Sequence, residues 1–210
     1  MGWLAYLIQH RGEALGLLGE HLLLVGVSTL LAATLGVPLG VWAVRSRRAQ
    51  RWVLGAANVV QTIPSLALFG FLIPLPLLGG IGTTPAIVAL LLYALLPIIR
   101  ATHTGITGID PAVREAADAM GMTPQQRLWQ MELPLALPVI FSGLRVATVI
   151  AVGTATIAAA IGAGGFGSYI FRGLATVDNR LILAGAVPAA LLALAADGGL
   201  GWVERRLGRR

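Results

Sequence analysis

Long apolar stretches separated by short arginine-rich segments make up most of this chain, and they limit what it can fold into. Of its 210 residues, 57% are hydrophobic and only 11% are charged. The mean hydropathy of +0.83 is well above that of soluble globular domains. A helix needs about 20 apolar residues to cross the roughly 30 Å hydrocarbon core of a bilayer. The sequence therefore predicts an all-α, multi-pass membrane protein with the lipid bilayer as a partner.

Five stretches are long and apolar enough to be predicted as spans. They cover about residues 21–44, 52–78, 84–102, 136–161 and 181–202. Residues 1–20 mix polar and apolar side chains too evenly to cross a membrane, so we expect an interfacial helix there. Prolines in the second and third spans are expected to kink them and free backbone carbonyls, which makes these spans candidates for lining a route. Residues 21–210 are predicted to form a single membrane domain.

The arginines predict how these spans are oriented. Four of them lie between residues 45 and 51, and positively charged loops favour the cytoplasm. Alternating sides from this loop puts eleven arginines at cytoplasmic positions and three outside. We therefore expect the N-terminus outside, the C-terminus in the cytoplasm, and a long cytoplasmic loop over residues 103–135.

The composition argues against several classes of chemistry. The chain has no cysteine, and all 15 basic residues are arginine, so it lacks the lysine that a Walker-type ATPase requires. Its three histidines lie on different segments, and no grouping of catalytic residues is evident. The arginine clusters lie beside apolar spans, where orientation explains them better than nucleic-acid binding. We expect no enzymatic activity, cofactor, metal or nucleic-acid partner for this chain itself.

The loop over residues 103–135 carries a long motif at fixed spacing. The pattern is Glu-Ala-Ala, three residues, Gly, nine residues, an apolar residue, one residue, a second apolar residue and Pro. Glu115, Ala116, Ala117, Gly121, Leu133 and Pro134 fit it, with Met131 where Ile is usual. This stretch resembles the EAA loop of ABC importer permeases. The resemblance implies that these six residues couple the chain to a separate ATP-hydrolysing subunit, and that replacing Glu115 or Gly121 uncouples hydrolysis from uptake.

Local signals in the same loop predict two short helices. Asp110 followed by Pro111 is typical of an N-cap with proline in the first turn. Gly121 is expected to end or bend that helix. Thr123 is expected to start a second helix, which the sequence Leu133-Pro134 closes before the next span. Two short helices at an angle are predicted to form a compact knob.

Four further blocks resemble permeases of the osmoprotectant uptake group. They are residues 61–69, 93–100, 153–167 and 181–188. The resemblance implies a methionine-importer-like permease fold in the cell inner or plasma membrane and import of glycine betaine, choline or carnitine by alternating access. It also implies a pair of cytoplasmic ATP-binding subunits, a second permease copy or a similar permease, and an extracytoplasmic substrate-binding protein. The alternatives are an ABC importer permease for another small zwitterion or amino-acid-like solute, and an ion-coupled secondary transporter.

Polar side chains within the expected spans are candidates for lining the translocation path. They are Gln61, Thr62, Ser65, Tyr93, Thr154 and Thr156. Helix–helix hydrogen bonding is an equally good explanation for each of them singly. Arg145 and Asp197 are the charged residues placed within spans, where an ion pair or snorkelling competes with a role in transport.

Two glycine patterns carry further expectations. Gly36 and Gly40 form a G-x-x-x-G that brings helices close, and a contact within the chain is favoured over a dimer seam. Residues 162–167 satisfy G-x-G-x-x-G, but they follow a span rather than a strand, so a dinucleotide site is not expected. A tight or flexible turn on the outer face is the prediction.

Overall fold

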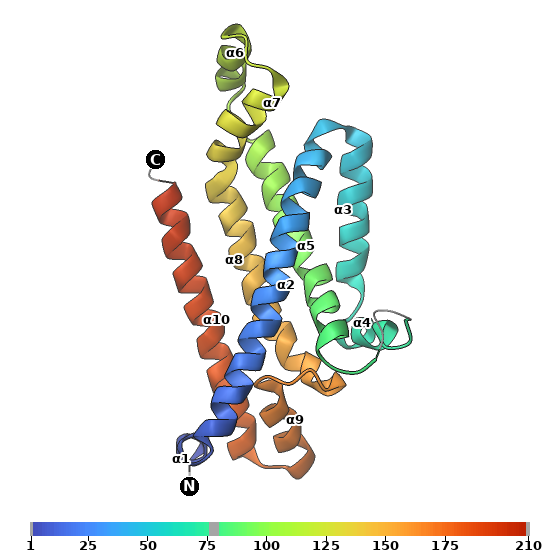
Figure 1. Cartoon of the computed structure of the whole chain (residues 1–210), viewed down its shortest axis with the longest axis vertical. Helices are drawn as coiled ribbons and strands as arrows, with labels where there is room; N and C mark the ends of the chain where they lie inside the picture. The colour runs from blue at the N-terminus through green and yellow to red at the C-terminus, as the bar shows by residue number, and fades with distance from the viewer. Residues whose placement is uncertain (1, 76–79, 209–210) are drawn as a thin grey trace.

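In the computed structural model, residues 2–75 and 80–208 are described, and their regular elements are all helical. The long helices are α2 (Arg11–Arg45), α3 (Arg47–Thr62), α5 (Thr83–Thr107), α8 (Leu133–Ala158) and α10 (Asn179–Leu207). The short elements are α1 (Trp3–Gln9), α4 (Ser65–Leu72), α6 (Pro111–Ala119), α7 (Pro124–Arg127), the π-helical turn η1 (Leu128–Glu132), the 3-10 turn η2 (Ala159–Ile161) and α9 (Gly167–Thr176). The long helices form an elongated bundle in which α5 packs against α2, α3 and α8 (Figure 1).

Four helical stretches of the described chain are long and apolar enough to cross a membrane. They are α2, α5, the continuous helical run from Pro124 to Ile161, and α10. The expected second span, residues 52–78, is not one straight helix, since α3 and α4 meet at an angle of 101°. The bend lies at Pro64, which has no N–H to donate and holds Ile63 in an extended conformation. The kink at this proline is confirmed, and residues 76–78 of the predicted span lie outside the described residues.

The first helix boundary is not where the sequence placed it. We predicted a separate helix over residues 1–20, but α1 ends at Gln9 and α2 runs without a break from Arg11 through residues 11–20. Leu17 is buried in this extension, and Glu13 and Glu20 have partners in the segment around α9. These tertiary contacts hold residues 11–20 in line with the apolar helix despite their polar composition.

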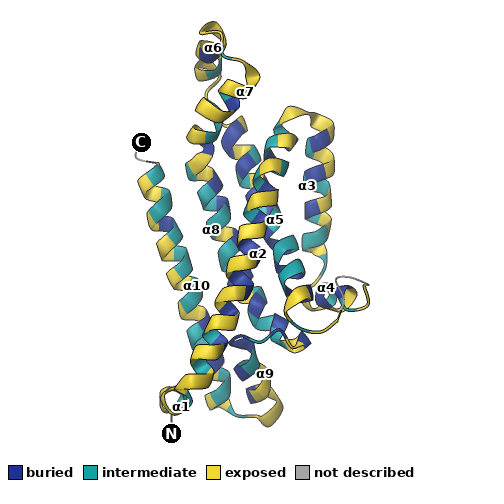
Figure 2. Ribbon diagram, viewed as in Figure 1, coloured by how far each residue is buried: buried dark blue, intermediate teal, exposed yellow. Residues whose placement is uncertain are grey.

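Glycines allow the central helices to approach one another closely. A Cβ added at Gly40 would lie 2.5 Å from the Cβ of Thr102, and one added at Gly143 would lie 2.2 Å from the Cβ of Ala101. Small residues at such positions let helix backbones come together in a membrane protein. The contact of Gly36 and Gly40 within the chain is thereby confirmed, and the buried residues follow α5 along the bundle (Figure 2).

The bundle has two distinct ends. One end carries α6, α7 and the junction between α2 and α3, and we call it the α6 end (Figure 1). The C-terminal half of α10 points toward this end. The opposite end, which we call the α9 end, carries α1, α9 and the turn over residues 162–167. The sequence left residues 168–180 unassigned, so the helix α9 was not predicted.

Candidate functional site

The motif-bearing helix α6 stands at the tip of the α6 end, and its own sequence defines both of its limits. Asp110 caps the N-terminus, accepting a hydrogen bond of 2.9 Å from the backbone N–H of Ala112, and Pro111 occupies the first turn. At the other limit Gly121 has a φ of +77°, a left-handed conformation that glycine adopts without a Cβ penalty. The predicted cap and the predicted glycine stop are both confirmed.

The second helix of the loop starts as predicted but does not end as predicted. Thr123 and Gln126 form a capping box at the start of α7. The helix then continues through the π-helical turn η1 directly into α8, so the sequence Leu133-Pro134 does not close it. In the shifted π register, the N–H of Leu133 donates to the carbonyl of Leu128. Pro134 follows directly, and because it has no N–H to donate, the ladder of backbone hydrogen bonds is interrupted at this position.

A network of ion pairs joins α6 to the base of α8. The Glu132 carboxylate lies 3.3 Å from Nε of Arg114 and 3.5 Å from Nε of Arg127. Arg127 also binds Asp118 of α6 at 2.6 Å, and Arg114 donates to the carbonyl of Ile106 near the end of α5. We call Arg114, Asp118, Arg127 and Glu132 the arginine clamp. The Glu132 side chain is only 12% exposed, so the centre of the clamp is largely shielded from solvent.

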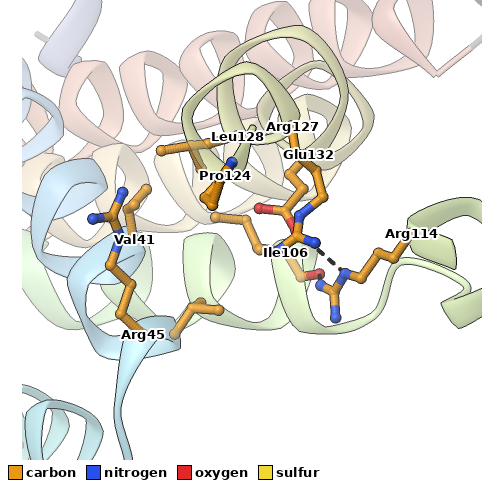
Figure 3. A pocket seen from close by; sticks show the side chains of 9 residues that line it. Val41, Arg45, Ile106, Arg114, Pro124, Arg127, Leu128 and Glu132 are labelled. Carbon is orange, nitrogen blue, oxygen red and sulfur yellow. Dashed lines mark hydrogen bonds and ion pairs between the residues drawn. The ribbon is translucent and has the colours of Figure 1, made fainter. Parts of the chain in front are cut away.

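The clamp borders a hollow of about 400 Å³ between α2, α5 and the start of the α7–α8 helix. It is lined by Val41, Val44, Arg45, Ile106, Arg114, Pro124, Arg127, Leu128 and Glu132. Figure 3 shows Arg114 and Arg127 reaching toward Glu132 from different elements, with Arg45 at the opposite wall. Three arginines and one carboxylate make this hollow positively charged.

The six predicted coupling residues fall into two groups. Glu115, Ala116 and Gly121 are exposed on or beside α6, whereas Ala117 is buried. Leu133 and Pro134 lie apart from them at the base of α8, where both line an apolar hollow of about 430 Å³. The neighbouring side chains of Met120 and Trp129 are also exposed, so the α6 end presents apolar as well as polar surface.

Sequence reasoning missed the clamp because its geometry depends on a local irregularity. In a regular α-helix, residues three or four apart are neighbours, and Arg127 and Glu132 are five apart. The π-helical turn, with its i→i+5 register, brings these two side chains together. The third partner, Arg114, lies on a separate helix, so no spacing rule connects it to Glu132.

The candidate path residues do not gather at one place. Gln61 lines a groove of about 430 Å³ between α3, α5 and α8, together with Arg100, Thr104 and Ser142. Thr62, Ser65, Tyr93, Thr154 and Thr156 are not among the residues that line this groove. Gln61 donates to the Tyr93 carbonyl at 2.9 Å, and the Tyr93 hydroxyl donates to the carbonyl of Ile63. Thr62 and Thr156 donate to backbone carbonyls three residues earlier.

The two charged residues expected within spans form an ion pair between helices. Nε and Nη2 of Arg145 on α8 lie 2.6 Å and 2.8 Å from the two carboxylate oxygens of Asp197 on α10. Nη1 of Arg145 lies 3.4 Å from Glu204. The bidentate geometry confirms the ion-pair interpretation, which accounts for both charges structurally.

The α9 end is held by a buried tyrosine ring and by partly buried or exposed polar contacts between α2 and the segment around α9. The Tyr169 hydroxyl donates to Glu13 at 3.1 Å, and Arg172 pairs with the same carboxylate. The backbone N–H of Gly165 donates to Glu20 at 2.8 Å, which pins the predicted glycine turn to α2. Burial and the Glu13 carboxylate raise the pKa of Tyr169 to about 12, so its hydroxyl stays protonated as a donor.

The sequence matches a known protein family over most of its length. Residues 34–209 match the family described as "Binding-protein-dependent transport system inner membrane component". The osmoprotectant import permease protein OsmW of Salmonella typhimurium is 46% identical over 209 residues, covering 99% of this chain and 95% of its own. The glycine betaine/carnitine/choline transport system permease protein OpuCD of Bacillus subtilis is 48% identical over 203 residues, covering 96% of this chain and 87% of its own.

Solved structures show the same fold. The MetNI methionine ABC transporter in an inward-facing conformation matches with a TM-score of 0.86 at 24% identity, covering 95% of this chain and 98% of that one. An amino acid ABC transporter crystallised with histidines matches with a TM-score of 0.80 at 17% identity, covering 98% and 99% of the two chains. At these identities the likeness establishes the arrangement of helices.

Proposed function

Because this chain belongs to the family of binding-protein-dependent transport system inner membrane components, we propose that it is the permease of an ABC importer for a quaternary-amine osmoprotectant. The substrate is of the glycine betaine, choline or carnitine type. The observation that carries this proposal is the similarity of 46% and 48%, over nearly the whole chain, to permeases named for osmoprotectants and for glycine betaine, carnitine and choline. The chain is a multi-pass inner-membrane protein.

ATP hydrolysis takes place on a separate pair of subunits, and α6 is the element that docks with them. Glu115, Ala116 and Gly121 are exposed at the tip of the molecule, where a cytoplasmic partner has free access. Apolar surface from Met120 and Trp129 lies beside them. An exposed mixture of apolar and charged side chains on a short, well-capped helix suits a protein interface better than a plain connecting loop.

The arginine clamp transmits movement of α6 to the membrane helices. Arg114 and Asp118 are the residues of α6 that form ion pairs with the start of the α7–α8 helix. Arg114 also reaches the end of α5 through the carbonyl of Ile106. Glu132 sits between the two arginines, so displacement of α6 pulls on α8 through this carboxylate. Glu132 is therefore a positioning residue of the coupling loop.

The membrane orientation follows from the charges at the two ends. The α6 end carries the cluster of four arginines over residues 45–51 and the basic C-terminal segment, and positive charge favours the cytoplasm. The α6 end is therefore cytoplasmic, the C-terminus lies in the cytoplasm, and the N-terminus lies outside. Counting the bent pair α3 and α4 as one broken span gives five spans.

The translocation path runs along the polar groove between α3, α5 and α8, which Gln61 lines. This groove is open on the surface of a single chain, so a second permease is required to complete it, either another copy or a similar chain. An extracytoplasmic binding protein delivers the substrate at the α9 end, and alternating access releases it at the α6 end. The remaining candidates, Thr62, Ser65, Tyr93, Thr154 and Thr156, lie on helices α3, α4, α5 and α8 but do not line this groove.

Two alternatives make different demands on the chain. An importer for another small zwitterion or amino-acid-like solute requires the same ATPase and the same loop. An ion-coupled carrier needs a carboxylate free to bind and release a proton or cation within a span. Asp197, the candidate, is held in a bidentate pair with Arg145, which disfavours the carrier.

Uptake into vesicles tests the proposal directly. Proteoliposomes containing this chain, the permease and ATPase that co-purify with it, and its binding protein are given radiolabelled glycine betaine, choline or carnitine with or without ATP. ATP-dependent uptake of any of the three supports both importer and substrate class. Hydrolysis stimulated by the binding protein without uptake of any of them keeps the importer and rejects the substrate class. Uptake that needs an ion gradient and no ATPase rejects the importer.

A further inference from the structure

The α2–α3 hairpin borders an apolar groove that is separate from the polar groove assigned to transport. The groove has a volume of about 400 Å³ and is lined by α2, α3 and α5. Its lining residues are Leu39, Trp42, Trp52, Val53, Ala56, Ala57, Val60, Leu92, Leu95 and Ile99. All ten are apolar, in contrast to the polar groove that Gln61 and Arg100 line.

The two grooves lie on different sides of α5. Leu95 and Ile99 line the apolar groove, whereas Arg100 and Thr104 line the polar one. At 3.6 residues per turn these two pairs point roughly 140° apart around the helix axis. If the polar groove faces the translocation path, the apolar groove faces away from it, toward the bilayer.

Two tryptophans place the mouth of this groove at the membrane surface. Trp42 is 54% exposed and Trp52 is 74% exposed, and both contribute to the lining. Tryptophan is enriched at membrane–water interfaces, where its ring lies at the level of the headgroups. The groove therefore runs from the headgroup level into the hydrocarbon core, parallel to the acyl chains of the surrounding lipids.

A cation without an acidic partner lies beside the mouth. Arg48 precedes Trp52 by four residues on α3, so their side chains are neighbours on the helix surface. Arg48 is exposed, and none of the ion pairs within residues 2–75 and 80–208 involves it. The sequence contains no Asp or Glu from residue 21 to residue 109, so the charge of this hairpin is not balanced locally.

We propose that this groove holds an acyl chain of an acidic phospholipid whose phosphate is bound by Arg48. An apolar groove that opens at headgroup level suits the chain, and an unbalanced guanidinium suits the phosphate, to which arginine donates two parallel hydrogen bonds. Zwitterionic lipid fills the same groove but adds a positive headgroup next to the arginine cluster. Acidic lipid is therefore selected by charge at the mouth.

Native mass spectrometry of the purified importer tests this site. The complex is exchanged into detergent containing equal amounts of phosphatidylglycerol and phosphatidylcholine with identical acyl chains, and the retained lipids are counted. The wild-type complex is expected to retain phosphatidylglycerol in excess. Arg48→Gln is expected to lower that excess about fivefold, as loss of one arginine at a membrane surface predicts. Arg205→Gln removes the same charge from α10 at the same end of the molecule and is expected to leave the excess unchanged.

A second variant tests the groove independently of the charge. Ala56 is exposed and lines the groove, so Ala56→Phe fills it without touching Arg48. This variant is expected to lose both lipids. If Arg48→Gln and Arg205→Gln lower the excess of phosphatidylglycerol equally, the proposal is overturned in favour of diffuse attraction between charges. Retention of lipid by Ala56→Phe together with loss of the second permease from the spectrum also overturns it, because the groove is then a contact between permeases.

Discussion

The two ends of this molecule are held together by different kinds of contact. At the α9 end, Tyr169 is fully buried and packs with Phe166 and Leu17, so α2, α9 and α10 share an apolar cluster. At the α6 end, α6 is joined to its base by the arginine clamp, whose outer partner Asp118 is 56% exposed. A buried large apolar side chain contributes about 1.5–3 kcal/mol, whereas an exposed ion pair contributes about 0–1 kcal/mol. The contacts that hold the α9 end are therefore the stronger ones, and we call this end the platform. The contacts that hold α6 are the weaker ones, and we call α6 the lever.

Matched glycine substitutions at the two ends test this contrast most strongly. A Cβ at Gly167 would lie 1.9 Å from the backbone carbonyl oxygen of Thr156, so Gly167→Ala forces α9 away from α8. We expect a loss of more than about 3 kcal/mol in the free energy of unfolding, and little folded protein. Gly121→Ala meets no atom within 4 Å and suffers only from its positive φ, at about 1–2 kcal/mol. The yield of folded protein and its melting temperature in detergent measure the effect of each substitution.

Similar losses from the two substitutions would show that the ends are equally rigid. The Gly121 variant should in addition assemble with its ATPase, since the interface of α6 is otherwise intact. A folded Gly167→Ala protein of normal stability would mean that α9 is free to move, contrary to the platform interpretation.

The sequence predicted the α6 end better than the α9 end, and the reason is the range of the contacts. Asp110, Thr123 and Gly121 act on neighbours a few residues away, so their roles were readable from local rules. Glu20 and Gly165 are separated by 145 residues, and no local pattern pairs them. The continuation of α2 through residues 11–20 depends on such distant partners, and the sequence placed that boundary wrongly.

The clamp is the exception at the α6 end. Its central residue, Glu132, was not predicted, because the π-helical turn changes which side chains are neighbours. The motif spacing identified the loop as a unit but not the contacts inside it. Similarly, the sequence left an ion pair between Arg145 and Asp197, snorkelling and a role in transport open, and the geometry shows the ion pair.

Removing the central carboxylate of the clamp tests how α6 is joined to α8. Glu132→Gln keeps the shape of the side chain but cannot neutralise Arg114 and Arg127, so α6 keeps only the exposed Asp118–Arg127 pair as its ion-pair tie to the α7–α8 helix. We expect uptake per ATP hydrolysed to fall about tenfold, equivalent to about 1.4 kcal/mol of lost coupling, with hydrolysis largely retained. Parallel measurements of ATPase rate and uptake in the same proteoliposomes give this ratio.

Asp118→Asn is the matched control within the same network. It removes the exposed partner of Arg127 and leaves Glu132 in place. Because an exposed ion pair contributes little, uptake per ATP hydrolysed should fall by less than about threefold. Equal effects from the two variants would remove the special role of Glu132. An unchanged ratio in Glu132→Gln would show that α6 transmits movement by another route.

The smallest expected effect comes from removing one hydroxyl at the α9 end. Tyr169→Phe keeps the buried ring and loses its hydrogen bond to Glu13, which Arg172 still neutralises. We expect about 1 kcal/mol of lost stability, seen as a fall of about 2–4 °C in melting temperature, with the ratio of uptake to hydrolysis unchanged.

Tyr6→Phe is the control, because the Tyr6 ring packs edge-on against Tyr169 and its hydroxyl makes no hydrogen bond within the described residues. If the α9 end is a platform, the Tyr169→Phe protein is less stable but still couples ATP hydrolysis to uptake. A Tyr169→Phe protein that hydrolyses ATP normally but transports poorly would instead make the α9 end a moving part, and the distinction between platform and lever would fail.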